Sequence, residues 1–449
     1  MKSLKHVAPT MFLILALGAG LGGALGQAQA PAPLRLTLEE AIEKGLQANL
    51  NAQLAGAQVD EAAGTRERRL AAALLPRVSA ETYANVQNRD LAAFGISLPG
   101  LPQVVGPFSN YDFRLYAQQN VFDLTNYRGL KASEKALDAD KLSYQDARDT
   151  IVRAVAALYL NAESAAARAD AAQSRVTDAE ALSKLARDKH DAGTATGVDV
   201  LRAEVQLAND KQALLEAQNQ VQQALLELAR DIGIDPGTPI ALAETLEFRP
   251  LAGQTAETLV PAAMTARADY QALAAQREAI VDEQRANRAR SYPKVSINGN
   301  YGAIGRNIGG VQGTGLVQGQ IDITLFDRDR EGEAQELAAQ LKSVDSRIAD
   351  LRRGIEEDVR QALLNLDSAG QQVNVASQGQ ELAKRELQMT RDRFQEGTAN
   401  NVEVITAQDE LARAEENYIL AESSYQDAEF ALARALGDTQ KNIAKFRKQ

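Results

Sequence analysis

The sequence contains no cysteine and no tryptophan, and it has only two histidines among its 449 residues. The missing thiols exclude a disulfide scaffold, a thiolate metal site and a cysteine nucleophile. His6 and His190 lie far apart in the chain, which argues against a histidine-based triad or a two-histidine metal site. No other convergent set of acids, bases or nucleophiles stands out. We therefore expect a protein that is not an enzyme and holds no cofactor and no metal.

Basic residues and long apolar runs are also scarce. The chain has 49 Lys and Arg against 60 Asp and Glu, so its net charge is −11. We expect no nucleic-acid partner, because no basic stripe is present to neutralise phosphates. Beyond the N-terminal segment, no stretch approaches the roughly 18 consecutive apolar residues of a spanning helix. If this chain crosses a membrane, it must do so with strands.

Residues 1–28 have the pattern of a secretory signal peptide. Lys2 and Lys5 form a short basic region, and Met11–Leu17 is a compact apolar segment. Gly26–Ala28 then supplies small residues before a cleavage site. A membrane anchor is the alternative, but the apolar segment is short for a span and glycines interrupt it. We therefore expect an exported protein.

The chain contains an internal repeat with an offset of 204 residues. At this offset Phe122-Asp123 recurs as Phe326-Asp327, and Gly193-Thr194-Ala195 recurs as Gly397-Thr398-Ala399. More than 110 residues align without a gap. Self-similarity at a fixed offset indicates two structural units built alike.

The repeat sets the expected domain organisation. We expect a first repeat over residues 36–234, a connector over 235–261, a second repeat over 262–437 and a basic tail over 438–449. The connector is rich in proline, which is typical of a linking segment and not of a core element. The tail has the composition of a poorly ordered end.

Both repeats contain long arms rich in Ala, Glu, Gln, Leu and Arg, with apolar residues at alternating spacings of three and four. This heptad pattern predicts coiled-coil helices. Their expected bounds are about 127–190, 198–231, 329–394 and 402–436. At 1.5 Å per residue the first arm of each repeat would be roughly 95 Å long. Helices of this length form a coiled-coil stalk or the wall of a long tube.

Between the opening helices and the long arms, the sequence pattern changes to strict alternation of apolar and polar residues. The expected strands cover about 78–88, 111–122, 294–304 and 315–326. Segments of about ten residues with one apolar face are typical of transmembrane barrel strands. A soluble antiparallel sheet with one wet face is the alternative. Four strands cannot close a barrel in lipid, so a barrel would have to be shared between two, three or four chains.

These features together resemble the TolC-type outer-membrane efflux channel family. The resemblance rests on the opening helix at Leu36–Ala41, the segment Leu74–Pro76, and the two tip motifs at Gly193–Leu201 and Gly397–Ile405. It implies an α+β membrane protein of two tandem repeats, each a β-hairpin plus long coiled-coil helices. It further implies a homotrimer whose 12-stranded barrel in outer-membrane lipid continues as a helical tunnel through the periplasm. A periplasmic adaptor and an inner-membrane pump are the implied partners.

The resemblance also implies a gate at the tips of the long helices. Glu403 matches the first acidic position of the family's gate, and Asp199 matches the acidic position of the first repeat. Thr406 stands where the family has a second acidic residue, and Ala399 stands where it has a basic one. Phe394 matches the family's aromatic residue but has no hydroxyl group to donate a hydrogen bond. The polar contacts that hold the gate shut must therefore differ from the family pattern. For the two acids, the alternative is an ordinary helix-start carboxylate favoured by the helix dipole.

The turns of the two tips are the expected docking points for the adaptor. Their candidate residues are Gly193, Thr194, Gly197, Gly397 and Thr398. From the resemblance we expect a passive duct of a tripartite efflux or secretion system, located in the outer membrane and extending into the periplasm. A periplasmic coiled-coil adaptor or structural protein is the alternative. Two hairpins at a fixed offset favour the duct.

Overall fold

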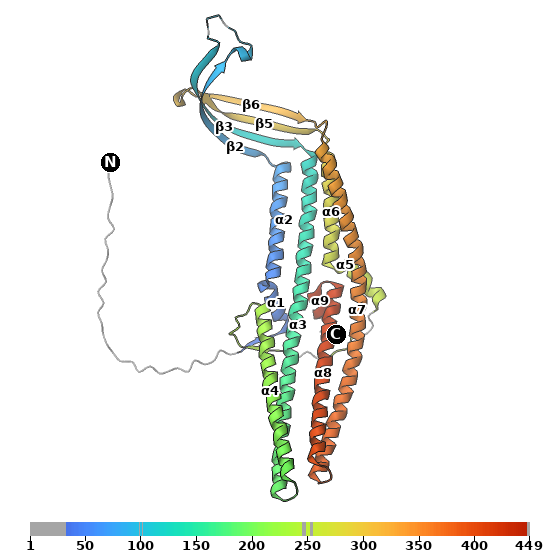
Figure 1. Cartoon of the computed structure of the whole chain (residues 1–449). Helices are drawn as coiled ribbons and strands as arrows, with labels where there is room; N and C mark the ends of the chain where they lie inside the picture. The colour runs from blue at the N-terminus through green and yellow to red at the C-terminus, as the bar shows by residue number, and fades with distance from the viewer. Residues whose placement is uncertain (1–32, 98, 101, 245–247, 252–254, 447–449) are drawn as a thin grey trace, which may run out of the picture.

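The computed structural model describes residues 33–97, 99–100, 102–244, 248–251 and 255–446. The expected signal peptide lies outside these residues. The described chain is elongated, with a four-stranded sheet at one end and the tips of two helical hairpins at the other (Figure 1). None of the described helices has both the length and the apolar character needed to traverse a bilayer.

The elements follow one another in the order in which the chain builds the two halves. The first half contains β1 (Leu34–Leu36), α1 (Leu38–Ala48), α2 (Leu50–Leu74), β2 (Arg77–Asp90), β3 (Val104–Phe122), α3 (Leu124–Asp191), α4 (Gly197–Asp231) and β4 (Ile240–Leu242). The second half contains α5 (Ala256–Ala266), α6 (Ala268–Ala289), β5 (Lys294–Gly305), β6 (Gln312–Asp322), α7 (Arg328–Gln395), α8 (Asn401–Leu436) and α9 (Thr439–Phe446).

The two longest helices, α3 and α7, have the same length of 68 residues. Each begins after an aspartate N-cap whose carboxylate accepts the N–H three residues later, at 3.0 Å for Asp123 and 3.3 Å for Asp327. Their buried positions follow the heptad pattern of the sequence. These include Ile151, Val155, Ala162, Val176 and Ala179 on α3, and Ile355, Val359, Leu366 and Val373 on α7. The helices α4 and α8 return antiparallel to them and complete the two hairpins (Figure 1).

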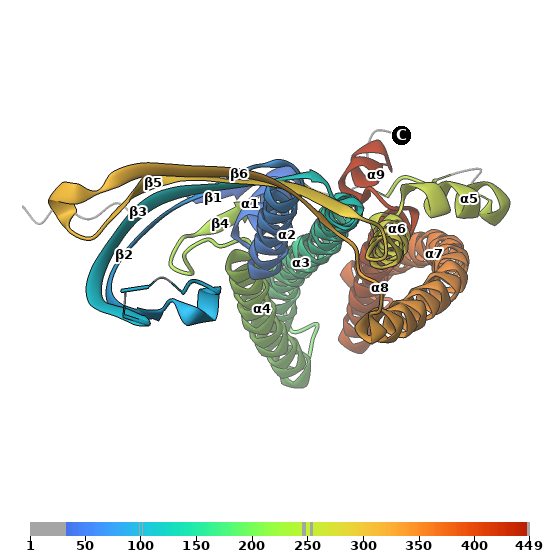
Figure 2. The same cartoon turned by 90° about the horizontal axis from the view of Figure 1, so that it is seen from above.

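The four-stranded sheet has the antiparallel order β2-β3-β5-β6. It extends sideways from the upper ends of α2, α3, α6 and α7 and curves along its length (Figure 1, Figure 2). Its first hairpin is longer than expected, because β2 continues to Asp90 and β3 already begins at Val104. The sequence did not predict this extension because it contains Gly106 and Pro107. Proline has no N–H to donate to a neighbouring strand, so it usually ends a strand. The pairing shifts register between Gln87 and Arg89, opposite this dipeptide, and such an irregularity accommodates the proline.

The sheet has one apolar face and one polar face. Residues paired across the strands share a face, so Leu115 lies between Ala80 and Tyr301. The apolar face also carries Val78, Val86, Phe113, Ile297, Val317 and Ile321. Tyr301 is 72% exposed and Val317 is 82% exposed. The opposite face carries Glu81, Asp112, Arg114, Asn300, Gln318 and Gln320. Large apolar residues therefore cover a face that the chain itself leaves open.

The largest buried core lies midway along the molecule, where α1, α3 and α8 pack together. Tyr159 is completely buried there, and its hydroxyl donates a hydrogen bond of 3.1 Å to the carbonyl oxygen of Leu36. Strand β1, which contains Leu36, pairs in parallel with β4. This pairing joins the start of the first half to its end, because β4 follows α4.

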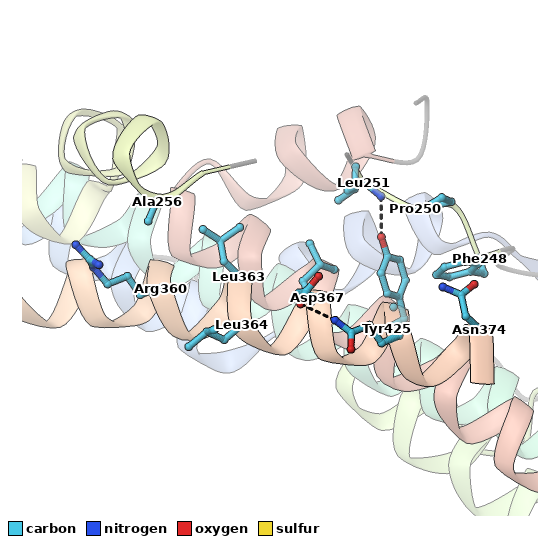
Figure 3. Close-up of a pocket in the computed structure, with 13 residues that line it drawn as sticks. Phe248, Pro250, Leu251, Ala256, Arg360, Leu363, Leu364, Asp367, Asn374 and Tyr425 are labelled. Carbon is cyan, nitrogen blue, oxygen red and sulfur yellow. Dashed lines mark hydrogen bonds between the residues drawn. The ribbon is translucent and has the colours of Figure 1, made fainter. Parts of the chain in front are cut away.

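Described residues of the segment 235–261, among them Ile240, Leu242 and Leu251, pack against this core, whereas the sequence predicted a connector. It contains β4 and the start of α5, and Phe248 packs edge-on against the ring of Tyr425, with centroids 4.6 Å apart. The Tyr425 hydroxyl accepts the N–H of Leu251 at 2.8 Å (Figure 3). It also donates to the carbonyl of Arg249 at 3.1 Å. Its prolines prevent a long helix, but the apolar residues between them remain free to pack.

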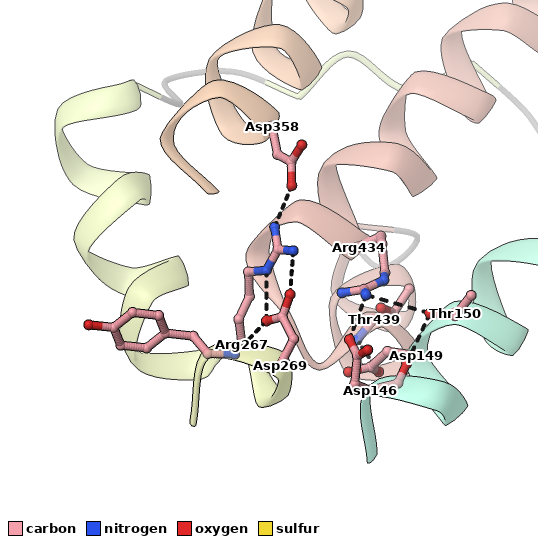
Figure 4. Close-up of polar contacts among 9 residues, drawn as sticks. Asp146, Asp149, Thr150, Arg267, Asp269, Asp358, Arg434 and Thr439 are labelled. Carbon is pink, nitrogen blue, oxygen red and sulfur yellow. Dashed lines mark hydrogen bonds and ion pairs between the residues drawn. The ribbon is translucent and has the colours of Figure 1, made fainter. Parts of the chain in front are cut away.

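The tail also differs from expectation, because residues 439–446 form α9 instead of a poorly ordered end. Gly437 ends α8 with a φ of +78°, which lets the chain turn back. The N–H of Thr439 then donates a hydrogen bond of 2.9 Å to Asp149 of α3 (Figure 4). Ile443 is 3% exposed in the main core. Burial of this side chain and capping by a buried carboxylate stabilise a helix that the basic composition did not suggest.

A second polar group in the same region joins α6 to α7. The guanidinium of Arg267 forms ion pairs of 2.6 Å with Asp269 and 2.7 Å with Asp358 (Figure 4). Arg434 of α8 pairs with Asp146 of α3 at 2.6 Å. Of these contacts, the Arg434–Asp146 ion pair links the two halves at mid-length, and the Arg267 pairs lie within the second half.

Candidate functional site

The two hairpin tips have the same backbone design. Gly193 and Gly397 adopt left-handed φ angles of +73° and +79°, which glycine adopts without a steric cost. The hydroxyls of Thr194 and Thr398 donate to the carbonyl five residues earlier, at 3.0 and 3.1 Å. Gly197 is already the first residue of α4, so it is not a turn glycine. The candidate docking residues thus form two matched, exposed turns at one end of the molecule.

Both candidate gate acids occupy the third position of a helix and form a capping box. Asp199 accepts the hydroxyl and the N–H of Thr196 at 2.6 and 3.0 Å, and these bonds lower the pKa of its carboxyl. Glu403 accepts the N–H of Asn400 at 3.2 Å, and the Asn400 side chain accepts the N–H of Glu403 at 3.0 Å. This geometry is that of the helix-start alternative.

Glu403 has a basic partner that sequence reasoning missed. Arg393, in the last turn of α7, lies 3.2 Å from the Glu403 carboxylate. The Glu403 side chain is 40% exposed and that of Arg393 is 53% exposed, so water screens this pair. The motif alignment placed the basic position at Ala399, which contributes no charge. The position of Arg393, in the last turn of α7 just before the tip, could have indicated this contact.

Two polar contacts join one tip to the other. The side-chain amide of Asn401 donates a hydrogen bond of 2.9 Å to the carbonyl oxygen of Asp199. The ammonium of Lys189 donates to the carbonyl oxygen of Phe394 and lies 4.3 Å from the centre of its ring. Neither Asn401 nor Lys189 belonged to the predicted site.

Phe394 is a packing residue at the tips. It is 6% exposed and belongs to an apolar cluster that both hairpins build. We call this the tip cluster; its buried members are Leu182, Leu387, Phe394, Val404 and Ala407. Thr406 stays outside this cluster, and its hydroxyl donates to the carbonyl of Val402 within α8 at 2.9 Å. The structure therefore brings Phe394, Asp199 and Glu403 close to the tip contacts, and Thr406 contributes only a local bond.

The charged groups of the tips are arranged in caps and ion pairs. The part of the chain that the structure describes has no group of three or more acidic or histidine side chains placed to hold a metal. The acids at the tips are held by helix caps and by single basic partners. Such an arrangement can attract cations and can tie helices together.

Comparisons with known proteins agree with this architecture. A family model described as outer membrane efflux protein matches residues 45–233 and 259–438. The toluene efflux pump outer membrane protein TtgF of Pseudomonas putida is 24% identical over 397 residues, which cover 83% of this chain and 77% of the relative. The pyoverdine export outer membrane protein OpmQ of Pseudomonas aeruginosa is 24% identical over 335 residues, which cover 69% of this chain and 65% of the relative.

Solved structures show the same fold. The crystal structure of the Campylobacter jejuni CmeC outer membrane channel matches with a TM-score of 0.72 at 16% identity, and the match covers 98% of each chain. At this identity the likeness describes the fold alone. It shows that a sheet at one end and paired long helices at the other are the architecture of an outer-membrane channel.

The fold is that of an outer-membrane channel, and the relatives are outer-membrane components of export systems. It belongs to the outer membrane efflux protein family, since the family model matches both of its halves. The resemblance to TolC-type channels, the export function and the location in the outer membrane and periplasm are confirmed. The relatives favour this reading over the alternative of a periplasmic adaptor.

Proposed function

We propose that three copies of this chain form a passive export duct, with a shared 12-stranded barrel and a helical tunnel whose narrow end lies at the hairpin tips. Two unpartnered apolar stripes on the long helices carry this proposal. On α4 the exposed residues are Val198, Leu201, Val205, Leu215 and Leu226, with exposed fractions between 48% and 68%. On α7 they are Leu364, Val375, Leu382 and Met389, with exposed fractions between 65% and 71%.

The stripes lie on helices at opposite sides of the chain (Figure 1). Because each copy presents a different stripe on each side, α4 of one copy can pack against α7 of the next. A head-to-tail contact of this kind generates a closed ring when the rotation between neighbouring copies closes on itself. Leu364 also lines the cleft of about 680 Å³ beside Tyr425, so the apolar surface of α7 continues into the mid-length region (Figure 3).

The stripes also match in height along the molecule. Gly370 of α7 lies beside the Tyr425 ring of α8, which sets the register within that hairpin. Gln206 of α4 donates to Asp409 of α8 at 3.3 Å. Residues of α4 and α8 that are 203 positions apart in the chain therefore lie at the same level along the molecule.

From this register, the apolar residues of the two stripes fall at shared levels. Leu226 of α4 is level with Leu364 of α7. Leu215 is likewise level with Val375. Neighbouring copies related by rotation about the long axis would therefore bring leucine against leucine or valine without sliding.

The sheet supports the same assembly. Within the described residues, β2 and β6 each pair on one side only, so both edges present unpaired backbone groups. In lipid such groups cost several kcal/mol each, and closure by neighbouring copies removes the cost. Three copies of four strands give 12 strands, with the apolar face toward lipid and the polar face toward the lumen.

In the trimer, three Glu403 side chains would surround the tunnel end. Their negative charge would attract cations, and Arg393 beside each would hold the helix starts in place. The exposed turns that contain Gly193 and Thr194, with Gly197 at the start of α4, and their counterparts Gly397 and Thr398, would dock a periplasmic adaptor. An inner-membrane pump would supply energy and choose the cargo.

Single-channel conductance in a planar bilayer tests the proposal. The purified protein should form small cation-selective pores that divalent cations block from the periplasmic side. Glu403→Gln should weaken this block at least about threefold, because the charge ring is removed while hydrogen-bonding capacity is kept. Glu416→Gln, an exposed acid further along α8, is the matched control. A protein that stays in solution without detergent and forms no pores would refute the duct.

A further inference from the structure

Charged side chains from all four long helices meet about 16 Å above the tips, measured from Asp199 to Asp210 along α4. They surround a small cavity of about 50 Å³ between the two hairpins. We call this group the inter-hairpin cluster; its charged members are Arg175, Asp178, Asp210, Lys384, Arg391, Asp409 and Glu415. The tip contacts described above do not include any of them.

One side chain bridges two carboxylates across the hairpins. The amide nitrogen of Gln206 lies 3.4 Å from both oxygens of Asp210 and 3.3 Å from one oxygen of Asp409. The two carboxylates are therefore within about 7 Å of each other, a distance at which like charges repel. These hydrogen bonds are long, so the amide offsets only part of the repulsion.

The cluster has one more acid than base. Its carboxylates belong to Asp178, Asp210, Asp409 and Glu415, and its bases are Arg175, Lys384 and Arg391. Arg391 of α7 pairs with Asp178 of α3 at 2.7 Å, which is a second link between the hairpins. Uptake of one proton would therefore balance the charge.

Two of the acids are placed to take up that proton. Burial raises the pKa of Asp210, against the opposing effects of Arg175 and the Gln206 amide. Burial also raises the pKa of Glu415, against Lys384 and Arg175. Both side chains are half-buried between helices of different hairpins. Their charged forms are therefore less hydrated when the hairpins are packed together than when the hairpins are apart.

The same cavity offers an acceptor for the added proton. The oxygen Oε1 of Gln408 is buried without a hydrogen-bond partner among the described residues. A protonated carboxyl has an O–H donor, whereas a carboxylate has none. Protonation therefore removes a repulsion and supplies a donor to a site that lacks one.

We propose that the inter-hairpin cluster is a proton-dependent lock, which draws the two hairpins together when Asp210 or Glu415 takes up a proton and loosens them when that proton leaves. A group whose pKa is higher in the packed state stabilises that state below its pKa and stops doing so as the pH rises through it. The hairpins are thus tighter in acid and looser at neutral pH. The consequence for conductance rests on the proposed function, but the change in packing does not.

Distance measurements between spin labels test the lock in the intact, detergent-extracted protein. The chain has no cysteine, so Ala192→Cys and Glu396→Cys place one label in each exposed tip turn without other reactive thiols. Labelled chains are diluted into an excess of unlabelled chain, so that the measured distance lies within one copy. Between about pH 7.5 and 5.0, we expect the ratio of short to long distances to rise about threefold or more.

The neutral variants Asp210→Asn and Glu415→Gln mimic the protonated acids. In the double variant we expect the short distance at both pH values. Glu216→Gln with Glu416→Gln removes one exposed acid from each of the same two helices and should leave the pH response intact. An unchanged distance in the unsubstituted chain, or a full pH response in the double neutral variant, would overturn the lock. Failure to form pores would count against the duct and would leave this distance result standing.

Discussion

The side chain of Asn401, at the start of α8, donates a hydrogen bond of 2.9 Å to the backbone carbonyl of Asp199, at the start of α4. Asn401 is 1% exposed. Its counterpart in the first half, at the repeat offset of 204, is Gly197, which has no side chain. This hydrogen bond therefore has no equivalent donated from the first half to the second. The two halves share a backbone design but differ at the residue that joins them.

Asn401→Ala should loosen the tips. It removes a buried hydrogen bond and leaves the Asp199 carbonyl without this donor, which costs about 1–2 kcal/mol of coupling between the hairpins. We expect a higher open probability in planar-bilayer recordings. Asn209→Ala, at an exposed site on α4, is the control and should match the unsubstituted channel. Equal open probabilities for Asn401→Ala and the control would show that this bond does not hold the tips.

Phe394→Ala should disorder the tip cluster. Removal of a buried phenylalanine typically costs about 3–5 kcal/mol, and here it also removes the ring beneath the Lys189 ammonium. Hydrogen exchange should speed up in the last turns of α7 and the first turns of α8, while the sheet stays protected. Phe394→Leu keeps most of the apolar volume and should give a smaller change. Unchanged exchange at the tips would mean that other contacts hold the cluster.

Leu215→Glu should prevent ring assembly, because it places a charge in the stripe of α4 that would face a neighbouring copy. Val375→Lys at the matching level of α7 should restore the ring by pairing with it. Native mass spectrometry in detergent measures the number of chains per particle. Leu420→Glu, which lies outside both stripes, is the control. Trimers that persist with Leu215→Glu alone would argue against contact between α4 and α7.

Asp149 should make the docking of α9 depend on pH. Burial raises the pKa of its carboxyl, although the N–H of Thr439 and the charge of Arg434 oppose the shift and Asp438 adds to it. A raised pKa in the folded state means stability that is present in acid and declines as the pH rises through that pKa. Asp149→Asn keeps the acceptor oxygen without the charge.

The melting temperature of Asp149→Asn relative to the unsubstituted chain should therefore rise as the pH increases from about 4 to 7. Asp149→Ala, which lacks the acceptor, should be less stable than both at every pH. A constant difference between the Asn variant and the unsubstituted chain would show that the carboxyl does not titrate in this range.

The heptad pattern predicted the long helices well, because it records which side chains must be buried. The expected arms at 127–190 and 329–394 compare with Leu124–Asp191 and Arg328–Gln395. The extension of the first β-hairpin was missed, since Pro107 breaks the local pattern and only pairing with the neighbouring strand compensates for it. The alternation of apolar and polar residues reports on one segment, whereas the length of a strand also depends on pairing with the neighbouring strand.

The candidate site was predicted only in part for a similar reason. Asp199 and Glu403 follow from the tip motifs, because a capping box is encoded within four consecutive residues. Lys189, Arg393 and Asn401 act across a turn or between hairpins, so no local motif contains both members of their contacts. Their partners are known only once the helices are packed.

By itself, the sequence determined the long helices, the internal repeat and the class of protein. Alternation of period two, heptads and turn glycines each follow from the local rules of burial and backbone geometry. The tertiary structure decided which polar groups hold the tips together, that segment 235–261 joins the core through Tyr425, and that α9 docks on Asp149. These contacts join residues far apart in the chain, and their energies depend on burial and distance, which packing alone establishes.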